Sequence, residues 1–146
     1  MPSHLGHVHL KVTDADRAVE FYRDVLGLDV TERVGRYAFL SFGEHHHDLA
    51  LQGTGGAGDD APDPREARTG LYHSAWEVDD AAALRAVAER LAARGVAVSP
   101  VDHGISKALY FDDPDGNGVE VYLDTRAERD VEAWDGRNER FDPFSL

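Results

Sequence analysis

Two histidines and one glutamate have the residue types and the placement to hold a metal ion. His7 in "GHVHLKV" and His73 in "LYHSAWEV" each open a stretch that alternates between apolar and polar residues, as a half-buried strand does. Glu120 lies inside "GVEVYL", where burying a carboxylate is costly unless it is paired or bound to a cation. Two imidazoles and one carboxylate leave open positions on one face of an octahedral ion. Such a set suits non-haem Fe(II), which binds substrate and dioxygen there.

Each of these residues also has a simpler interpretation. A histidine at a strand start can be an ordinary polar residue, and Glu120 could face solvent because Val119 and Val121 share the opposite face. Zinc competes with iron, since two histidines and a glutamate also form catalytic zinc sites. The sequence lacks the helical H-E-x-x-H motif that usually supplies such zinc ligands.

An internal repeat places the two histidines at equivalent positions. His73 follows His7 by 66 residues, and Asp80 follows Asp14 by the same distance. In each half the strand is followed by an aspartate that can cap a helix and by apolar residues at helical spacing. The apolar positions are Ala18, Phe21, Tyr22 and Val25 in the first helix and Leu84, Val87, Ala88 and Leu91 in the second. Three further strands are expected in each half, so both halves have the order strand–helix–strand–strand–strand.

The repeat predicts an α+β protein of two βαβββ modules that pack into a single domain spanning residues 1–146. Module one covers about residues 4–52 and module two about residues 70–124. Residues 53–69 are rich in Gly, Pro and Asp without periodicity, and they are expected to be a linker or surface loop. Residues 125–146 form a charged tail with three aromatic residues, which we expect to pack on the body or on a second subunit.

The composition narrows the classes of function. The net charge of −13 argues against binding to nucleic acid or to anionic membrane surfaces, which need basic patches. Cysteine is absent, so disulfides, thiolate metal sites and a cysteine nucleophile are excluded. No apolar run is long enough for a signal peptide or a membrane span, and the cytoplasm is the expected location.

The stretches "LGHVHLKVTDADRAVEFYRDVLGL", "LYHSAWEVDD" and "LYFDDPDGNGVEVY" resemble the vicinal oxygen chelate superfamily. It is also called the glyoxalase/bleomycin-resistance/extradiol-dioxygenase superfamily. The resemblance covers residues 5 to 124 and implies paired βαβββ modules that form a cup-shaped mixed sheet around one metal. It places His7, His73 and Glu120 at the metal-ligand positions.

Within the superfamily, two stretches resemble small single-chain catechol 2,3-dioxygenases. In this group a histidine just before the last strand of one module serves as the acid–base residue. His47 in "EHHHDLAL" is the best match, and a shift of one residue in register would assign the role to His46. Tyr110 precedes Glu120 by ten residues, where the group carries a tyrosine that hydrogen-bonds the substrate oxygen.

Two further histidines are candidates for substrate binding. His103 in "DHGISKALYF" lies near the position of another polar active-site residue of the group. His9 shares a strand face with His7, where it can line the pocket or have a structural role. His45 is expected to be solvated.

The resemblance implies an extradiol dioxygenase that cleaves an aromatic diol with O₂, using Fe(II) or alternatively Mn(II). Glyoxalase-type relatives use a fourth protein ligand from the last strand of the first half. Here "DLALQ" offers only Asp48 or Gln52, so three ligands are the simpler interpretation. The alternatives are a glyoxalase, an epimerase, a fosfomycin thiol transferase, or a metal-free antibiotic-binding protein. We expect a homodimer or larger homo-oligomer, because the aromatic residues of the tail would otherwise be exposed.

Overall fold

The structure, a computed structural model, describes residues 1–56 and 62–146. It divides into two compact units. The first unit contains residues 1–61 together with the turn Asp113–Gly116, and the second contains Pro62–Asp112 and Asn117–Leu146. The predicted linker partly lies outside the described residues. Among those that are described, no helix combines the length and the apolar character needed to cross a membrane.

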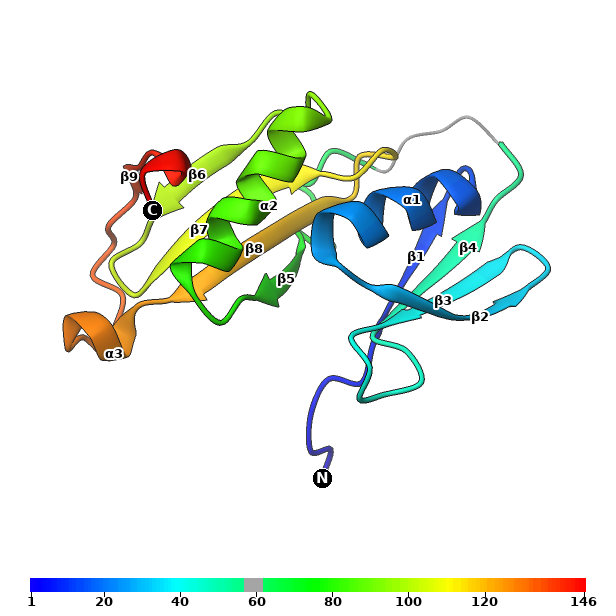
Figure 1. Cartoon of the computed structure of the whole chain (residues 1–146), viewed down its shortest axis with the longest axis horizontal. Coiled ribbons are helices and arrows are strands. Elements are labelled where there is room, and N and C mark those ends of the chain that lie inside the picture. The colour runs from blue at the N-terminus through cyan, green and yellow to red at the C-terminus, as the bar shows by residue number, and fades with distance from the viewer. Residues whose placement is uncertain (57–61) are drawn as a thin grey trace. The chain divides into compact units, whose positions relative to one another are not determined.

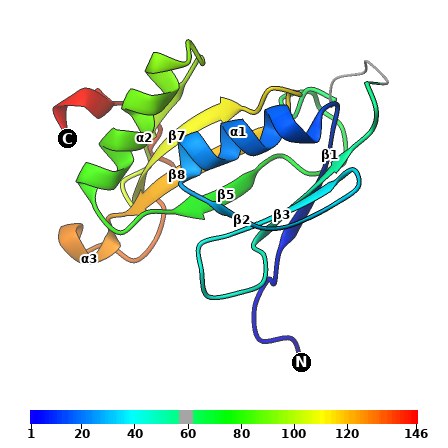
Figure 2. The same cartoon turned by 45° about the vertical axis from the view of Figure 1, so that its right-hand side comes forward.

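The first unit is a four-stranded sheet covered by one helix (Figure 1). Its elements are β1 (Val8–Val12), α1 (Ala15–Leu26), β2 (Asp29–Val34), β3 (Tyr37–Ser41) and β4 (Leu49–Gly53). The strand order is β1-β4-β3-β2, with β1 and β4 parallel and the other pairs antiparallel. Helix α1 lies along one face of this sheet (Figures 1 and 2).

Local sequence signals explain where α1 begins and ends. The Asp14 carboxylate accepts hydrogen bonds from the backbone N–H groups of Asp16 and Arg17, which otherwise lack partners at a helix start. Gly27 ends the helix in the left-handed region, at φ 73°, where a side chain would be strained. The predicted apolar positions of α1 are all buried.

The turn Asp113–Gly116 is held in the first unit by carboxylates. Asp115 accepts hydrogen bonds from the backbone N–H of Thr13 at 3.1 Å and from Arg17 at 2.8 Å. Asp113 accepts one from the hydroxyl of Tyr22 at 2.8 Å. Burial and the neighbouring carboxylates raise the pKa of Tyr22 well above its usual value, so this hydroxyl remains a donor.

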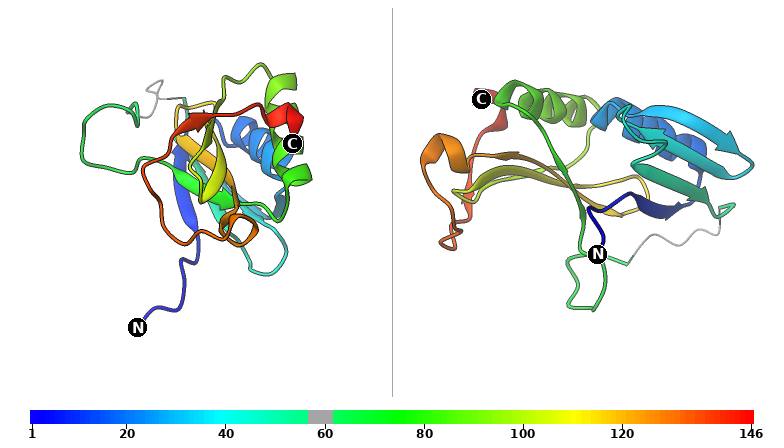
Figure 3. Two further views of the ribbon diagram at one scale, coloured as in Figure 1. Left: turned by 90° about the vertical axis from the view of Figure 1, so that its left-hand side faces the viewer. Right: turned by 90° about the horizontal axis from the view of Figure 1, so that it is seen from below.

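The second unit repeats the plan of the first and adds a strand and two short helices. Its elements are β5 (Ser74–Glu77), α2 (Ala81–Ala93), β6 (Ser99–Asp102), β7 (Ser106–Asp112), β8 (Gly118–Asp124), α3 (Arg126–Arg129), β9 (Glu139–Arg140) and the 3₁₀ helix η1 (Pro143–Ser145). The strand order β5-β8-β7-β6 matches that of the first unit, and β9 extends the sheet beside β6. Helix α2 covers one face, and η1 lies beside it (Figure 3).

The observed elements confirm the predicted α+β class and the repeated βαβββ order. Each sheet is mixed. The first and last strands of each βαβββ module pair in parallel, namely β1 with β4 and β5 with β8. The C-terminal tail is ordered on the second unit, where Val101 and Asp102 pair with Arg140 and Glu139.

Candidate metal and substrate site

His73 and Glu120 meet on one face of the second sheet. His73 immediately precedes β5, and β5 pairs in parallel with β8, which carries Glu120. Nε2 of His73 lies 2.8 Å from Oε2 of Glu120, and the two side chains are only 24% and 12% exposed. Val119 and Val121 are buried on the opposite face of β8. Glu120 therefore points away from the core but is largely covered, which differs from the solvated alternative.

Gly118 permits the close approach of His73 to β8. A Cβ at position 118 would lie 2.4 Å from the carbonyl oxygen of Tyr72 and 3.3 Å from the Cβ of His73. Any side chain there would push the segment carrying His73 away from Glu120. No local pattern in the sequence marks this role, because Gly118 is the first residue of β8 and the steric requirement comes from Tyr72, which is distant in the chain.

Tyr110 connects Glu120 to His103. It lies on β7 directly opposite Glu120 in register, and its hydroxyl is 3.0 Å from Oε1 of Glu120. Nε2 of His103 lies 2.8 Å from the same hydroxyl oxygen. Burial, together with the adjacent carboxylate, raises the pKa of Tyr110 far above its usual value. Tyr110 therefore keeps its proton and can donate it in a hydrogen bond.

A pocket of about 710 Å³ opens beside these residues and is lined by His73, His103 and Tyr110. Its volume lies in the range of small-molecule sites. Other lining residues include Arg65, Tyr72, Val98, Val101 and Asn138. The pocket thus combines apolar walls with a few polar groups, and Asn138 belongs to the C-terminal tail.

In the first unit, His47 lies beside His7. Their ring centroids are 4.5 Å apart, and the ring of Phe39 lies 5.0 Å from that of His47. Partial burial, followed by the neighbouring imidazole of His7, lowers the pKa of His47 and favours its neutral form. His7 itself is exposed just before β1.

The other histidines of the run make different contacts. His46 is exposed and its Nε2 lies 3.0 Å from a carboxylate oxygen of Glu32. His45 is also exposed, as predicted, with Nδ1 3.5 Å from Asp48. The run also contains a close pair, in which Nδ1 of His46 lies 3.0 Å from Nδ1 of His47. His9 is exposed on β1, with its ring edge-on to Tyr37.

The structure brings together two of the three predicted metal ligands. His73 and Glu120 belong to the second unit and His7 to the first. Within either unit, the described residues include no group of three or more His, Asp or Glu side chains placed to hold a metal ion. The three-ligand set therefore remains a prediction.

The His73–Glu120 pair fits a metal ion. Ligands in neighbouring positions of an octahedral ion with bonds of about 2.1 Å have donor atoms about 3 Å apart. The 2.8 Å between Nε2 of His73 and Oε2 of Glu120 is close to that value. An imidazole nitrogen and a carboxylate oxygen are also common ligands of Fe(II), Mn(II) and Zn(II).

The chain belongs to the glyoxalase/bleomycin resistance protein/dioxygenase superfamily, whose family model matches residues 4–121. It is 35% identical over 122 residues to catechol-2,3-dioxygenase from Bacillus subtilis (strain 168), covering 84% of this chain and 42% of that protein. It is 31% identical over 125 residues to a manganese-dependent 2,3-dihydroxybiphenyl 1,2-dioxygenase from Geobacillus genomosp. 3. That match covers 82% of this chain and 36% of the relative.

Solved structures show the same fold. The crystal structure of a lactoylglutathione lyase from Agrobacterium tumefaciens superposes with a TM-score of 0.62 at 30% identity. The match covers 84% of this chain and 94% of that one. The chain spans less than half the length of the two dioxygenases above. The vicinal oxygen chelate fold and membership of a superfamily that includes dioxygenases and lyases are therefore established for this chain.

Proposed function

We propose that the protein is an extradiol dioxygenase that cleaves a catechol-type aromatic diol with O₂. The observation that carries this proposal is the chain of contacts from His103 through Tyr110 to Glu120 and His73 at the edge of one pocket. A phenolic donor beside a metal-ligand pair is suited to a substrate that binds through an ionised oxygen. The similarity to a catechol-2,3-dioxygenase supports the same activity.

His7, His73 and Glu120 are the proposed ligands of Fe(II), with Mn(II) as the alternative. When bound, the metal would supply a centre on which the diol and O₂ react, so that both oxygen atoms enter the ring-opened semialdehyde and no external reductant is needed.

The protein's own side chains have distinct proposed roles. Tyr110 donates its O–H proton to a substrate oxygen and stabilises the charge that develops there. His47 takes up the second diol proton and returns it during ring opening, as an acid–base residue. Because Nδ1 of His47 faces Nδ1 of His46, we assign this transfer to Nε2. His103 supports Tyr110, and its ring lines the pocket.

The pocket suits a flat aromatic substrate. Val98 and Val101 provide apolar walls, and Tyr72 adds a ring 4.9 Å from that of His73. His9 is a further proposed contact in the first unit. The proposed partners are thus a small aromatic diol and O₂, without nucleic acid or membrane.

Anaerobic reconstitution tests the activity. The purified chain is loaded with Fe(II) without oxygen, catechol is added, and air is admitted while the visible spectrum is recorded. A yellow ring-fission product that requires Fe(II), catechol and O₂ supports the proposal. Tyr122→Phe is the control for substitutions of the pocket residue Tyr110. It removes a hydroxyl that donates a hydrogen bond to the exposed Glu77. No product from catechol or a substituted catechol with full metal occupancy would contradict it.

Lactoylglutathione lyase activity is the second candidate, because a lyase of that name shares the fold at 30% identity. Such an enzyme needs a fourth ligand from the last strand of the first half. Gln52 on β4 is half-buried, and Asp48, just before β4, already accepts a hydrogen bond from the backbone N–H of Phe42. A lyase assay that follows lactoylglutathione formation distinguishes the two. Product in that assay alone favours the lyase.

We further propose that both units form one domain, that the chain assembles as a homodimer or larger homo-oligomer, and that it acts in the cytoplasm. The first two of these proposals rest on the internal repeat and on the aromatic residues of the tail.

A further inference from the structure

We propose that residues 125–138 of the C-terminal segment form a positioning element of the site, in which the carbonyl of Arg137 fixes a proton on Nδ1 of His103 and thereby presents Nε2 to Tyr110. The position of His103 follows from contacts within the second unit. Its consequence for turnover rests on the proposed dioxygenase function.

The tautomer follows from the partner of Nδ1. Nδ1 of His103 lies 3.3 Å from the carbonyl oxygen of Arg137, and a carbonyl can only accept a hydrogen bond. Nδ1 must therefore carry the proton if this contact is a hydrogen bond. The same carbonyl accepts the indole N–H of Trp134 at 3.0 Å, and the Trp134 ring stands nearly perpendicular to that of His103. Two rings are thus held by one carbonyl group.

The residues on either side of His103 are tied to the same segment. Asp102 accepts two hydrogen bonds from Arg129, at 2.7 and 2.8 Å, and is buried. The carbonyl oxygen of Gly104 accepts bonds from Arg129 at 3.0 Å and from the hydroxyl of Thr125 at 2.9 Å. A two-point Arg–carboxylate contact restrains both distance and orientation. The turn carrying His103 is therefore fixed by contacts that precede and follow it.

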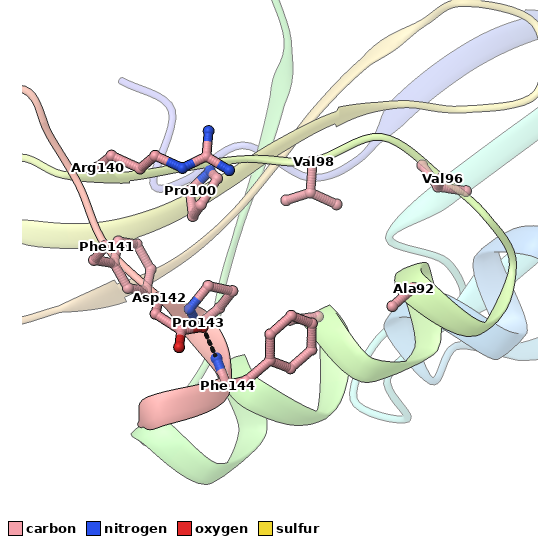
Figure 4. A pocket seen from close by; sticks show the side chains of 10 residues that line it. Ala92, Val96, Val98, Pro100, Arg140, Phe141, Asp142, Pro143 and Phe144 are labelled. Atoms are coloured by element: carbon pink, nitrogen blue, oxygen red, sulfur yellow. Dashed lines mark hydrogen bonds between the residues drawn. The ribbon is translucent and has the colours of Figure 1, made fainter.

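The far end of the tail is anchored independently. Arg140 pairs with Val101 at the edge of the sheet, and the residues that follow reach helix α2. Figure 4 shows Phe141, Pro143 and Phe144 around a second pocket of about 580 Å³, with Ala92 of α2 on its other side. Because this anchor lies beyond residue 138, substitutions at Trp134 can disturb the Arg137 carbonyl without releasing the tail.

Counting protons shows what this arrangement does for the site. With Nδ1 of His103 protonated, a neutral ring can only accept at Nε2, and Glu120 also only accepts as a carboxylate. The single hydroxyl proton of Tyr110 then serves two acceptors, at 2.8 and 3.0 Å. If Nε2 of His103 also carries a proton, each contact from the Arg137 carbonyl through His103 and Tyr110 to Glu120 has one donor and one acceptor. The segment thus directs any proton taken up by His103 to the atom that faces Tyr110.

The tautomer can be measured without metal or substrate. In the 146-residue chain labelled with ¹⁵N at histidine, long-range ¹H–¹⁵N spectra identify which ring nitrogen is protonated in the neutral form. We expect His103 to carry its proton on Nδ1, and this preference to weaken in Trp134→Ala. Trp134→Phe keeps a ring but removes the N–H donor and should be intermediate. Arg33→Ala is the matched control, because Arg33 bonds the exposed Asp16 in the first unit, away from the tail.

The kinetic arm separates this inference from the proposed function. With Fe(II) and catechol, Trp134→Ala should lower kcat about tenfold or more, as expected for imperfect positioning, while KM changes less than about threefold. A proton on Nε2 of neutral His103 would overturn the inference even in an active enzyme. The expected tautomer in a chain without dioxygenase activity would leave the positioning role intact and contradict the function. Unchanged kcat in Trp134→Ala, with an altered tautomer, would overturn the role in turnover.

Discussion

Nε2 of His73 lies 2.8 Å from Oε2 of Glu120, and both side chains are largely covered at the edge of one pocket. A half-buried histidine and carboxylate in direct contact can form a simple ion pair or can share a cation. The close contact depends on Gly118, because any larger residue there would collide with the backbone that carries His73. This requirement supports a specific role for the pair. The pair therefore provides the sharpest test of the proposed metal site.

Replacing Glu120 by alanine should abolish binding of about one divalent metal per chain, because the imidazoles of His73 and His7 alone form a poor site without the carboxylate. His73→Ala and His7→Ala should do the same. Metal content after dialysis, measured by atomic emission, checks this. The control is Glu77→Gln, which alters an exposed carboxylate bonded to Tyr122. Full metal occupancy in Glu120→Ala would remove the basis of the assignment.

Tyr110→Phe should retain the metal but lower kcat by about 10²–10³-fold, the usual cost of losing a donor aimed at developing charge. The hydroxyl bonds both Glu120 and His103, and its raised pKa keeps the proton in place across the working pH range. Steady-state kinetics with one catechol at saturating O₂ measure the effect. A variant as active as the wild type would show that Tyr110 only fills space.

The three adjacent histidines should respond differently to alanine substitution. His47 contacts His7 and is half-buried, whereas His45 and His46 are exposed and lie beside carboxylates. We expect His47→Ala to keep metal and bind catechol but to lose about 10²–10⁴-fold in turnover. His45→Ala should be nearly silent. A loss at His46 alone would shift the role by one residue, and equal mild losses at all three would count against any acid–base role in the run.

Local patterns in the sequence were sufficient for most of the fold. Asp14 was predicted as a helix cap from its residue type and position, and the burial of Phe21 and Tyr22 from their helical spacing. Both signals involve residues close together in the chain. The repeat of 66 residues predicted the second βαβββ order from the first. The alternation in "GVEVYL" correctly placed Glu120 on the face opposite its valines, although it could not show how far other residues cover that side chain.

The contacts that complete the site depend on distant residues and were not predictable in this way. Asp102 looks like an ordinary polar strand end, yet it is buried because Arg129 reaches it from the tail. Strand β9 is two residues long and has no periodicity of its own, so its pairing with β6 gives no sequence signal. The need for glycine at position 118 arises only when Tyr72 is packed against it.

We expect the chain to form dimers through its aromatic tail. Trp134 and Phe144 remain 55% and 47% exposed, and exposed aromatic surface of this kind commonly marks contacts. Light scattering at micromolar concentration should give twice the monomer mass of 16.1 kDa. Phe144→Asp should shift the equilibrium toward monomer with an unchanged circular dichroism spectrum. A monomeric wild type would contradict the prediction.

Acid should selectively weaken the contact between Asp102 and the tail. Hydrogen bonds from Arg129 are the main cause that lowers the pKa of Asp102 to about 2, against burial, which acts in the opposite direction. Because the folded pKa is depressed, this carboxylate contributes stability above its ordinary pKa near 3.8, and the contribution is lost as the pH falls toward 2. The shift corresponds to roughly 2 kcal/mol at neutral pH.

Comparing the wild type with Asp102→Asn isolates this contribution from the many other carboxylates of the chain. Chemical denaturation at a series of pH values gives the free energy of unfolding of each. The wild type should be the more stable above pH 5, and the gap should narrow steadily between pH 4 and pH 2 as Asp102 becomes protonated. Asp142→Asn is the matched control, since that exposed aspartate caps η1 and leaves the Arg129 contact in place. A gap that stays constant over this range would mean that Asp102 stabilises the tail by packing alone, and that its charge has no part in holding the turn of His103.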